Sequence, residues 1–214
     1  MGRLALCLTQ PSPFCMSLKS SYRFLAPFYD VFLERITRHA RQRSLSRLPQ
    51  AGSARVLLSG AGTGLDFPHL PRCHAYTAVD LTRAMLTRSI PRAGGLNMQW
   101  VQGDSMNLPF AAATFDYVVL HLIVAVVPQP HRCMTEAARV LKPGGRILLF
   151  DKFLRRAERA WLRRGLSPLS GKLVTRLDVV FEDELQRVPA LQVLTDQPAL
   201  AAGWFRLIEL QKEA

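Results

Sequence analysis

The sequence has no apolar run long enough to cross a bilayer, which needs about 20 consecutive apolar residues. The longest candidate, residues 117–127, is interrupted by His121, so we predict no transmembrane helix. Residues 4–8 are too short for the apolar core of a secretory signal. The first 29 residues hold no acidic residue and faintly resemble a transit peptide. We interpret residues 1–20 as a flexible N-terminal extension.

Cysteine and acidic residues are both scarce. The four cysteines, Cys7, Cys15, Cys73 and Cys133, form no C-x-x-C pair and no zinc-ligand spacing, so we expect reduced thiols and no metal site. Asp and Glu total 16 against 28 Lys and Arg, which gives a net charge of +12. That imbalance favours anionic partners such as nucleic acid, a phospholipid surface or an acidic substrate, and charge alone does not choose among them.

The rest of the composition is that of a globular protein. Hydrophobic residues make up 49% of 214 residues, which is enough to bury the core of one domain. The patterns of strands and helices alternate along most of the chain. Because strands separated by helices form βαβ units, we predict a mostly parallel sheet with helices on both faces. The predicted strands are residues 55–59, 75–80, 98–102, 115–124 and 146–150, with helices at residues 84–89 and 131–141.

The two ends of the chain differ from its middle. Residues 191–195 and 204–210 predict two more strands, which would close the sheet as an antiparallel pair. Residues 22–48 predict one or two amphipathic helices rich in arginine. We expect one α/β domain, residues 21–214, in which residues 151–190 form a basic helical insertion or lid.

Three glycines, Gly60, Gly62 and Gly64, follow the first predicted strand. A turn without Cβ atoms lets the backbone approach a ligand closely, as in the first turn of Rossmann-like nucleotide-binding folds. The dinucleotide pattern G-x-G-x-x-G would require a glycine at Leu65 or Phe67, and no Gly-Lys-Ser/Thr of a P-loop follows. The turn therefore predicts a nucleotide-like cofactor and argues against NAD, FAD and P-loop nucleotides.

Two aspartates follow the next two predicted strands. Asp80 ends the second strand, where an acidic side chain can accept hydrogen bonds from a ribose diol. Asp104 follows the third strand, where a carboxylate can accept from an adenine amino group. Either residue alone is more often a helix cap or a turn residue. Together they predict a nucleoside site at the carboxyl edge of the sheet.

As a set, these motifs resemble those of the class I S-adenosylmethionine-dependent methyltransferases, which have a single Rossmann-like domain with a seven-stranded sheet. The matching segments are residues 56–64, 78–86, 103–104, 108–110 and 138–147. The resemblance covers residues 22–150 and implies S-adenosylmethionine as the cofactor. It places the cofactor against Gly60, Ala61, Gly62, Thr63, Gly64, Asp80, Leu81, Met85, Asp104, Ser105 and His121.

One position departs from this family. Leu58 stands where these methyltransferases usually have an acidic residue that contacts the methionine part of the cofactor. We expect Leu58→Glu to tighten cofactor binding if the side chain reaches the ligand, and to destabilise the protein if it lies in the core. The alternative to an enzyme is a methyltransferase-like module that binds the cofactor without catalysis and serves a partner protein, because fold alone does not fix function.

Methyl transfer from a sulfonium is an in-line displacement, so few residues have to be catalytic. His121, near the end of the fourth predicted strand, is the first candidate for a base or for positioning the acceptor. The alternative is a strand-end histidine that bonds the backbone. Tyr22 and Tyr29, on the predicted leading helix, are the next candidates, although aromatic residues at helical spacing also form cores.

The class of methyl acceptor is indicated by one motif that the sequence lacks and by one segment that it contains. Enzymes that methylate exocyclic amines of nucleic acids have an Asn/Asp-Pro-Pro-Tyr motif after the fourth strand, and residues 120–130 lack it. Residues 22–30 resemble the leading helix of the quinone-ring C-methyltransferases and of the bacterial phosphatidylethanolamine N-methyltransferases. We expect a small or lipid-like acceptor, with residues 126–130 and 166–169 favouring a phospholipid amine slightly over a quinone-like ring.

Arginines concentrate in residues 35–47 and 155–164. We expect these segments to bind an anionic membrane surface, with Phe153, Leu154 and Trp161 entering the interface. The alternative is that the apolar residues cap the site and the arginines are solvated. The expectation for localisation is a cytoplasmic protein that lies peripherally at the membrane.

Overall fold

The computed structural model describes residues 34–154 and 179–213. Its first element is a helix of residues 34–45, which we call the leading helix. The strands are β1 (Arg55–Ser59), β2 (Ala75–Asp80), β3 (Asn97–Gln102), β4 (Phe115–His121), β5 (Leu141–Lys152), β6 (Leu191–Leu200) and β7 (Phe205–Lys212). The other helices are α2 (Arg83–Ser89), α3 (Pro130–Val140) and α5 (Phe181–Leu185), with 3-10 turns η1 (Phe67–His69), η2 (Ile90–Ala93) and η3 (Ala201–Gly203). Tyr22, Tyr29, Trp161 and the arginines of residues 155–164 lie outside the described residues.

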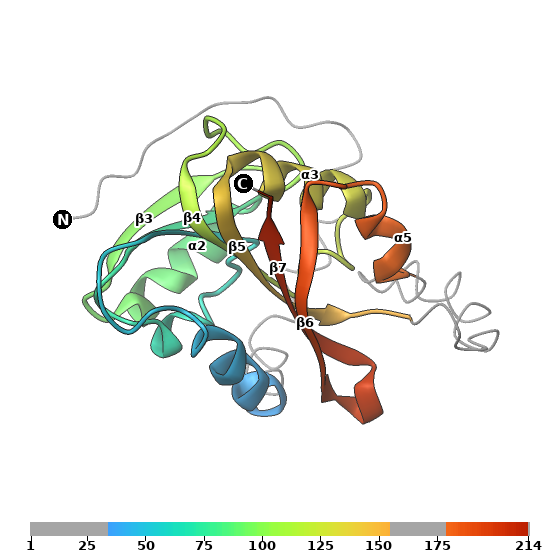
Figure 1. The fold of residues 1–214 in the computed structure, drawn as a ribbon. Coiled ribbons are helices and arrows are strands. Elements are labelled where there is room, and N and C mark those ends of the chain that lie inside the picture. The colour runs from blue at the N-terminus through green and yellow to red at the C-terminus, as the bar shows by residue number, and fades with distance from the viewer. Residues whose placement is uncertain (1–33, 155–178, 214) are drawn as a thin grey trace.

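The seven strands form one sheet in the order β3-β2-β1-β4-β5-β7-β6 (Figure 1). Strands β1 to β5 run parallel, whereas β7 is antiparallel to both of its neighbours, β5 and β6. The predicted mostly parallel sheet with an antiparallel C-terminal pair is confirmed. Because the parallel strands all end at one edge, the loops that follow β1, β2, β3, β4 and β5 meet there.

Strand β4 ends at His121, earlier than the predicted end at residue 124. Leu122 has a left-handed backbone, with φ 57°, and its amide donates to the Phe150 carbonyl at 2.7 Å. This conformation turns the chain out of the sheet. Val124 and Ala125 remain fully buried, so the apolar pattern that predicted a longer strand belongs to a buried turn.

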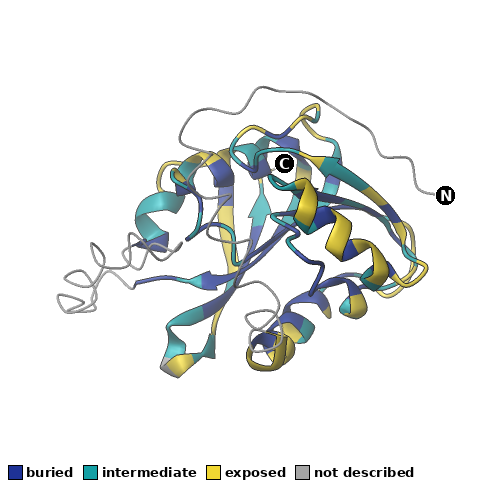
Figure 2. Ribbon diagram, turned by 180° about the vertical axis from the view of Figure 1, so that it is seen from behind, coloured by how far each residue is buried: buried dark blue, intermediate teal, exposed yellow. Residues whose placement is uncertain are grey.

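Side chains alternate between two cores, one on each face of the sheet. Leu57 packs in the core that contains α3 and α5, whereas Leu58 packs with Leu45 and Leu48 of the opposite core. Leu45 belongs to the leading helix. Figure 1 shows α3 and α5 to the right of the sheet and the blue leading helix below it, and Figure 2 shows buried residues, in dark blue, along the central strands. The predicted helices on both faces are therefore confirmed.

The segment that follows β5 is buried where the sequence predicted membrane contact. Phe153 and Leu154 are 2% and 1% exposed, and Phe153 packs against Phe181 of α5. The expectation that these two residues enter a membrane interface is therefore wrong. No helix among residues 34–154 and 179–213 is long and apolar enough to cross a membrane.

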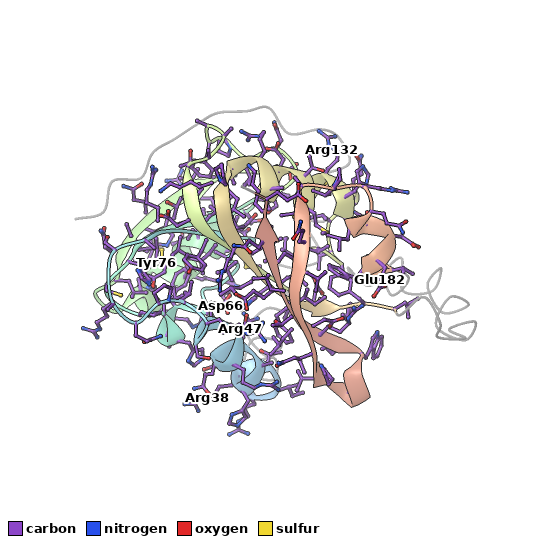
Figure 3. All side chains as sticks on the ribbon, in the orientation of Figure 1. Arg38, Arg47, Asp66, Tyr76, Arg132 and Glu182 are labelled. Carbon is purple, nitrogen blue, oxygen red and sulfur yellow. The ribbon has the colours of Figure 1, made fainter. Side chains whose placement is uncertain are left out.

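Helix α5 is acidic rather than basic. Its first turn contains Glu182 (labelled in Figure 3), Asp183 and Glu184. Glu182 pairs with the buried Arg206 of β7 at 2.8 Å. The ion pair holds α5 against the sheet. The predicted basic part of the insertion falls on residues 155–178, outside the described residues.

Candidate functional site

The glycine turn wraps around the end of β2. The amides of Gly60 and Ala61 both donate to the carbonyl of Val79, at 2.9 and 2.8 Å. Gly60, Gly62 and Gly64 have φ values of 75°, 54° and 80°, which residues with a Cβ atom rarely adopt. The turn therefore needs glycine for its backbone conformation as well as for space.

Only the middle glycine faces open space. A Cβ atom at Gly60 would meet the Ile123 side chain at 2.6 Å, and one at Gly64 would meet Phe67 and Ser89 at 2.9 Å. A Cβ atom at Gly62 would have no heavy atom within 4 Å. Gly62 therefore offers a bare backbone beside the carboxyl edge, where a ligand can approach closely.

The carboxylate of Asp80 fixes this turn from the end of β2. Its Oδ2 accepts the amide of Gly62 at 2.9 Å and its Oδ1 accepts the amide of Thr82 at 2.9 Å. Burial raises the pKa of Asp80, against the lowering effect of these two hydrogen bonds. Each carboxylate oxygen has a further lone pair for a ligand hydroxyl.

The end of β3 lies beside the end of β2. The amide of Gly103 donates to the carbonyl of Asp80 at 3.0 Å, and Oδ1 of Asp104 accepts the amide of Met106 at 2.8 Å. Ser105 is buried and its hydroxyl accepts from Ser59 at the end of β1, at 2.8 Å. The structure thus brings the predicted ribose and adenine residues to adjacent strand ends.

The remaining predicted cofactor residues have different surroundings. Thr63 is buried, and its carbonyl accepts from Arg92 at 2.7 Å. Leu81 and Met85 are half-buried at the end of β2 and on α2. Tyr22 and Tyr29 lie outside the described residues.

His121 has both ring nitrogens in hydrogen bonds. Its Nδ1 lies 2.7 Å from Oδ1 of Asp66, and its Nε2 lies 2.9 Å from Oγ of Ser44 on the leading helix. The side chain is 1% exposed and meets the ring of Phe150 edge to face. The alternative expected from the sequence was a strand-end histidine that bonds the backbone. The structure differs from it, because both hydrogen-bond partners of His121 are side chains.

Asp66 joins His121 to a buried arginine. Arg41, one turn before Ser44 on the leading helix, donates to the same Oδ1 of Asp66 at 2.7 Å and to Thr37 at 3.0 Å. Burial alone would raise the pKa of Asp66, but the charges and hydrogen bonds of Arg41 and His121 outweigh it and leave the pKa below its ordinary value. Asp66, Ser44 and Thr37 are not among the site residues predicted from the sequence, and Arg41 falls in the arginine-rich segment 35–47 that was predicted to face a membrane. That grouping was wrong for Arg41, which is buried.

Leu58 lies in the core rather than at the carboxyl edge of the sheet, where the cofactor is predicted. It is 1% exposed and pairs across the sheet with Ala78 and Val119. The neighbouring residue, Ser59, is the last of β1 and bonds Ser105. Leu58 therefore belongs to the core that packs against the leading helix, and an acidic residue at this position would be buried there.

A second carboxyl, also missed in the sequence, lies at the end of β5. Oδ2 of Asp151 accepts the amide of Ala125 at 3.0 Å, and its Oδ1 accepts the amide of Lys152 at 2.8 Å. Asp151 thereby ties the turn after β4 to β5. Burial raises its pKa to about 6. In the described part of the chain, no three His, Cys, Asp or Glu side chains are placed to hold a metal ion.

Comparison with known proteins shows the family. Residues 57–149 match the model of a methyltransferase domain. The sequence is 29% identical to a phosphatidylethanolamine N-methyltransferase from Cereibacter sphaeroides, over 92% of this chain and 98% of that protein. The chain is a class I S-adenosylmethionine-dependent methyltransferase. S-adenosylmethionine is accordingly its methyl donor.

Two further comparisons bear on this methyltransferase. It is 34% identical over 142 residues to a ubiquinone/menaquinone biosynthesis C-methyltransferase from Roseobacter denitrificans, covering 63% of this chain and 56% of that protein. The chain thus spans about half the length of this quinone relative. The YcgJ protein from Bacillus subtilis has the same fold, with a TM-score of 0.65 and 19% identity over 83% of this chain and 99% of that one.

Proposed function

We propose that the enzyme binds S-adenosylmethionine across the ends of β1, β2 and β3. The bare backbone at Gly62 supports this site, because a Cβ atom there would fill space that the cofactor needs. Asp80 would accept the ribose hydroxyls, and Asp104 with Ser105 would lie against the adenine. The residues proposed to line the site are Gly60, Ala61, Gly62, Thr63, Gly64, Asp80, Leu81, Met85, Asp104, Ser105 and His121.

The acceptor we propose is the amine of a phospholipid. The observation that carries this proposal is the length of the match to the phosphatidylethanolamine N-methyltransferase, which covers 98% of that relative. The quinone relative matches over a shorter region. This similarity extends beyond residues 57–149, which match the methyltransferase domain, and so includes segments that can bind the acceptor.

Methyl transfer requires the protein chiefly to align the methyl donor with the acceptor. Bound S-adenosylmethionine supplies a methyl group on a sulfonium, and the acceptor nitrogen forms a C–N bond to it as the C–S bond breaks. The protein holds the two reactants in line and excludes water. An ethanolamine ammonium must also lose a proton before its lone pair can attack. Tyr22 and Tyr29 are the catalytic residues we propose. His121, predicted for the same role from the sequence, already has a side-chain partner at each ring nitrogen.

The test is transfer of a labelled methyl group to lipids. The purified protein is incubated with methyl-labelled S-adenosylmethionine and vesicles of phosphatidylethanolamine with phosphatidylglycerol, and the lipids are separated. We expect label in N-methylated phosphatidylethanolamine and none with vesicles in which phosphatidylcholine replaces phosphatidylethanolamine. Label in neither lipid would overturn the phospholipid proposal.

A quinone-like ring is the second candidate, supported by the 34% identity to the quinone C-methyltransferase. The same assay with a reduced demethylquinone in detergent tests it. Label in the quinone and not in the phospholipid would identify the quinone-like ring as the acceptor in place of the phospholipid amine. A protein that binds the cofactor but labels neither substrate would favour the module that serves a partner protein.

We further propose that the enzyme meets its acceptor at an anionic membrane surface. Arg35, Ile36 and Arg38 are all exposed near the start of the leading helix, and Ile36 is a large apolar residue with 44% exposure. Arginines beside exposed apolar side chains suit the boundary between phospholipid head groups and acyl chains. The later arginines suit it less, because Arg47 bonds Thr195 and Gln197 on β6.

A further inference from the structure

A buried polar network joins three separate segments at the cofactor edge. The leading helix contributes Thr37, Arg41 and Ser44, which share one face at helical spacing. The segment after the glycine turn contributes Asp66, and the end of β4 contributes His121. We call these five residues the Asp66 network. Its central carboxylate accepts from Arg41 and His121 at 2.7 Å each.

Burial of the charged side chains in this network costs free energy of desolvation, so the network needs a functional explanation. Arg41, Asp66 and His121 are 6%, 5% and 5% exposed. Burying a charge carries a large desolvation cost, and apolar residues of similar volume often replace buried charges without loss of stability. The leading helix already has apolar contacts through Ala40, Leu45 and the core around Leu58. Attachment of the helix alone does not require the charged residues.

The position of Asp66 indicates what the network does. Asp66 follows Gly64 by two residues and is the N-cap of the 3-10 turn η1, whose Phe67 amide donates to the Gly64 carbonyl at 3.1 Å. The first end of the glycine turn is held by the Val79 carbonyl at Gly60 and Ala61, and its middle is held by Asp80 at Gly62. Fixing Asp66 therefore clamps the second end of a loop whose open side faces the cofactor.

The geometry of Ser44, His121 and Asp66 resembles that of a nucleophilic triad, with the serine hydroxyl at Nε2 and the carboxylate at Nδ1. Ser44 is 2% exposed within the leading helix, so a substrate cannot reach its hydroxyl. The arrangement instead holds the imidazole by both nitrogens. Because Ser44 and His121 are both buried away from any substrate, the imidazole is suited to positioning.

We propose that the Asp66 network is a positioning device that locks the leading helix onto the glycine turn and so sets the affinity for the cofactor. Asp66 is its central residue, and His121 acts through it rather than on the methyl acceptor. The proposal rests on the cofactor site proposed above. It predicts that weakening the network loosens the glycine turn even in the ligand-free protein.

A matched control exists at the other end of the leading helix. Glu209 on β7 is a second buried carboxylate, and it pairs with Arg146 at 2.9 Å and with Arg47, which follows the leading helix, at 3.7 Å. The ion-pair partners of Glu209 lie on β5 and after the leading helix, away from the glycine turn, whereas Asp66 belongs to the segment that follows that turn. Asp66→Asn and Glu209→Gln each remove one buried negative charge without changing the shape of the side chain.

The experiment measures binding of S-adenosylhomocysteine by calorimetry, well below the melting temperature, together with the melting temperatures. We expect both variants to melt at lower temperature than the wild type. Asp66→Asn should raise the Kd about tenfold or more, whereas Glu209→Gln should leave it within twofold. Equal weakening by both variants, or no weakening by Asp66→Asn, would overturn the proposal.

Amide hydrogen exchange of the ligand-free proteins separates this inference from the proposed cofactor site. We expect Asp66→Asn to speed exchange at residues 61–66 at least tenfold relative to the wild type, and Glu209→Gln to leave these amides unchanged. If the wild type does not bind S-adenosylhomocysteine but Asp66→Asn still speeds exchange as expected, the proposed cofactor site is refuted. The clamping of the glycine turn by Asp66 is then still supported. Unaltered exchange in Asp66→Asn would refute the clamp itself.

Discussion

The amide of Gly62 donates a hydrogen bond to Oδ2 of Asp80 at 2.9 Å, across the gap between the glycine turn and the end of β2. The carboxylate therefore has two tasks in the proposed site, because it shapes the turn and faces the ribose. Protonation of Asp80 would weaken both interactions at once. Cofactor affinity is thus linked to the charge of one side chain.

The first prediction concerns pH. Because burial raises the pKa of Asp80, we expect the affinity for S-adenosylhomocysteine to fall on acidification at a higher pH than an ordinary aspartate would give. The stability contribution of Asp80 has the opposite sign, since a raised pKa in the folded state favours folding at low pH. Calorimetry over a pH series measures the affinity. Asp80→Asn should bind more weakly by about 1.5–3 kcal/mol at neutral pH and should lose most of the acid dependence.

The second prediction separates two glycines of the same turn. Gly62→Ala places a methyl group in open space, so we expect a stability loss of only about 1–2 kcal/mol from its left-handed backbone but a large loss of cofactor binding. Gly60→Ala would collide with Ile123 and should lower the melting temperature much more. Thermal melts with and without S-adenosylhomocysteine measure both effects. A Gly62→Ala protein that is stabilised by the ligand as much as the wild type would contradict the proposed site.

The third prediction concerns Leu58. Leu58→Glu would bury a carboxylate beside Ala78 and Val119, in an apolar core that also contains Leu45 and Leu48. We expect a loss of more than about 3 kcal/mol in the free energy of unfolding, measured by urea denaturation. Leu58→Met, which conserves volume, should cost less than about 1.5 kcal/mol. Tighter cofactor binding by a stable Leu58→Glu protein would show that the side chain reaches the ligand after all.

The sequence predicted the parts of this fold that depend on local patterns. The alternation of strands and helices predicted the parallel sheet, and the glycines with Asp80 and Asp104 predicted residues that the structure brings to one edge. The end of β4 could not be predicted, because residues 122–124 are apolar in a buried turn as they would be in a strand.

The Asp66 network could not be predicted either, for a different reason. Arg41 stands among other arginines on an amphipathic helix, and its sequence neighbours do not distinguish a buried arginine from a solvated one. Its partners, Asp66 and His121, lie far away in sequence. The only local signal is that Thr37, Arg41 and Ser44 recur on the helix face that also carries Ala40 and Leu45, where apolar residues would be expected.

The fourth prediction concerns stability against pH at Asp151. Its pKa in the folded state is raised by burial to about 6, so between about pH 4 and pH 6 the folded protein holds a proton that the unfolded chain releases. Its contribution is fully present below pH 4 and is lost as the pH rises through 6, at a cost of about 3 kcal/mol. Lys152 and Cys133 lie close enough to interact with this carboxyl. Urea denaturation of the wild type and of Asp151→Asn at pH 4.5 and 7.5 isolates the effect, because the stability difference between the two proteins should change by about 2 kcal/mol, the part of the loss that falls between these two pH values. A difference that is independent of pH would contradict it.

The last prediction concerns the membrane surface. Arg35 and Arg38 are exposed on the leading helix, and Figure 3 shows Arg38 at the outer end of that helix, far from Arg132 on α3. Each arginine near an anionic surface contributes about 1 kcal/mol, so we expect Arg35→Gln with Arg38→Gln to reduce binding to phosphatidylglycerol vesicles roughly thirtyfold.

The control for this prediction removes the same charge elsewhere. Arg132 and Arg187 are exposed on the side of the sheet that carries α3 and α5, and changing both to Gln should leave vesicle binding within twofold. Co-sedimentation measures the bound fraction, which should rise with the content of anionic lipid and fall with salt. If both double variants lose binding equally, net charge rather than the leading helix attracts the membrane. If the wild type stays in the supernatant at low salt, the membrane proposal fails, and an acceptor that reaches the site from solution becomes the better explanation.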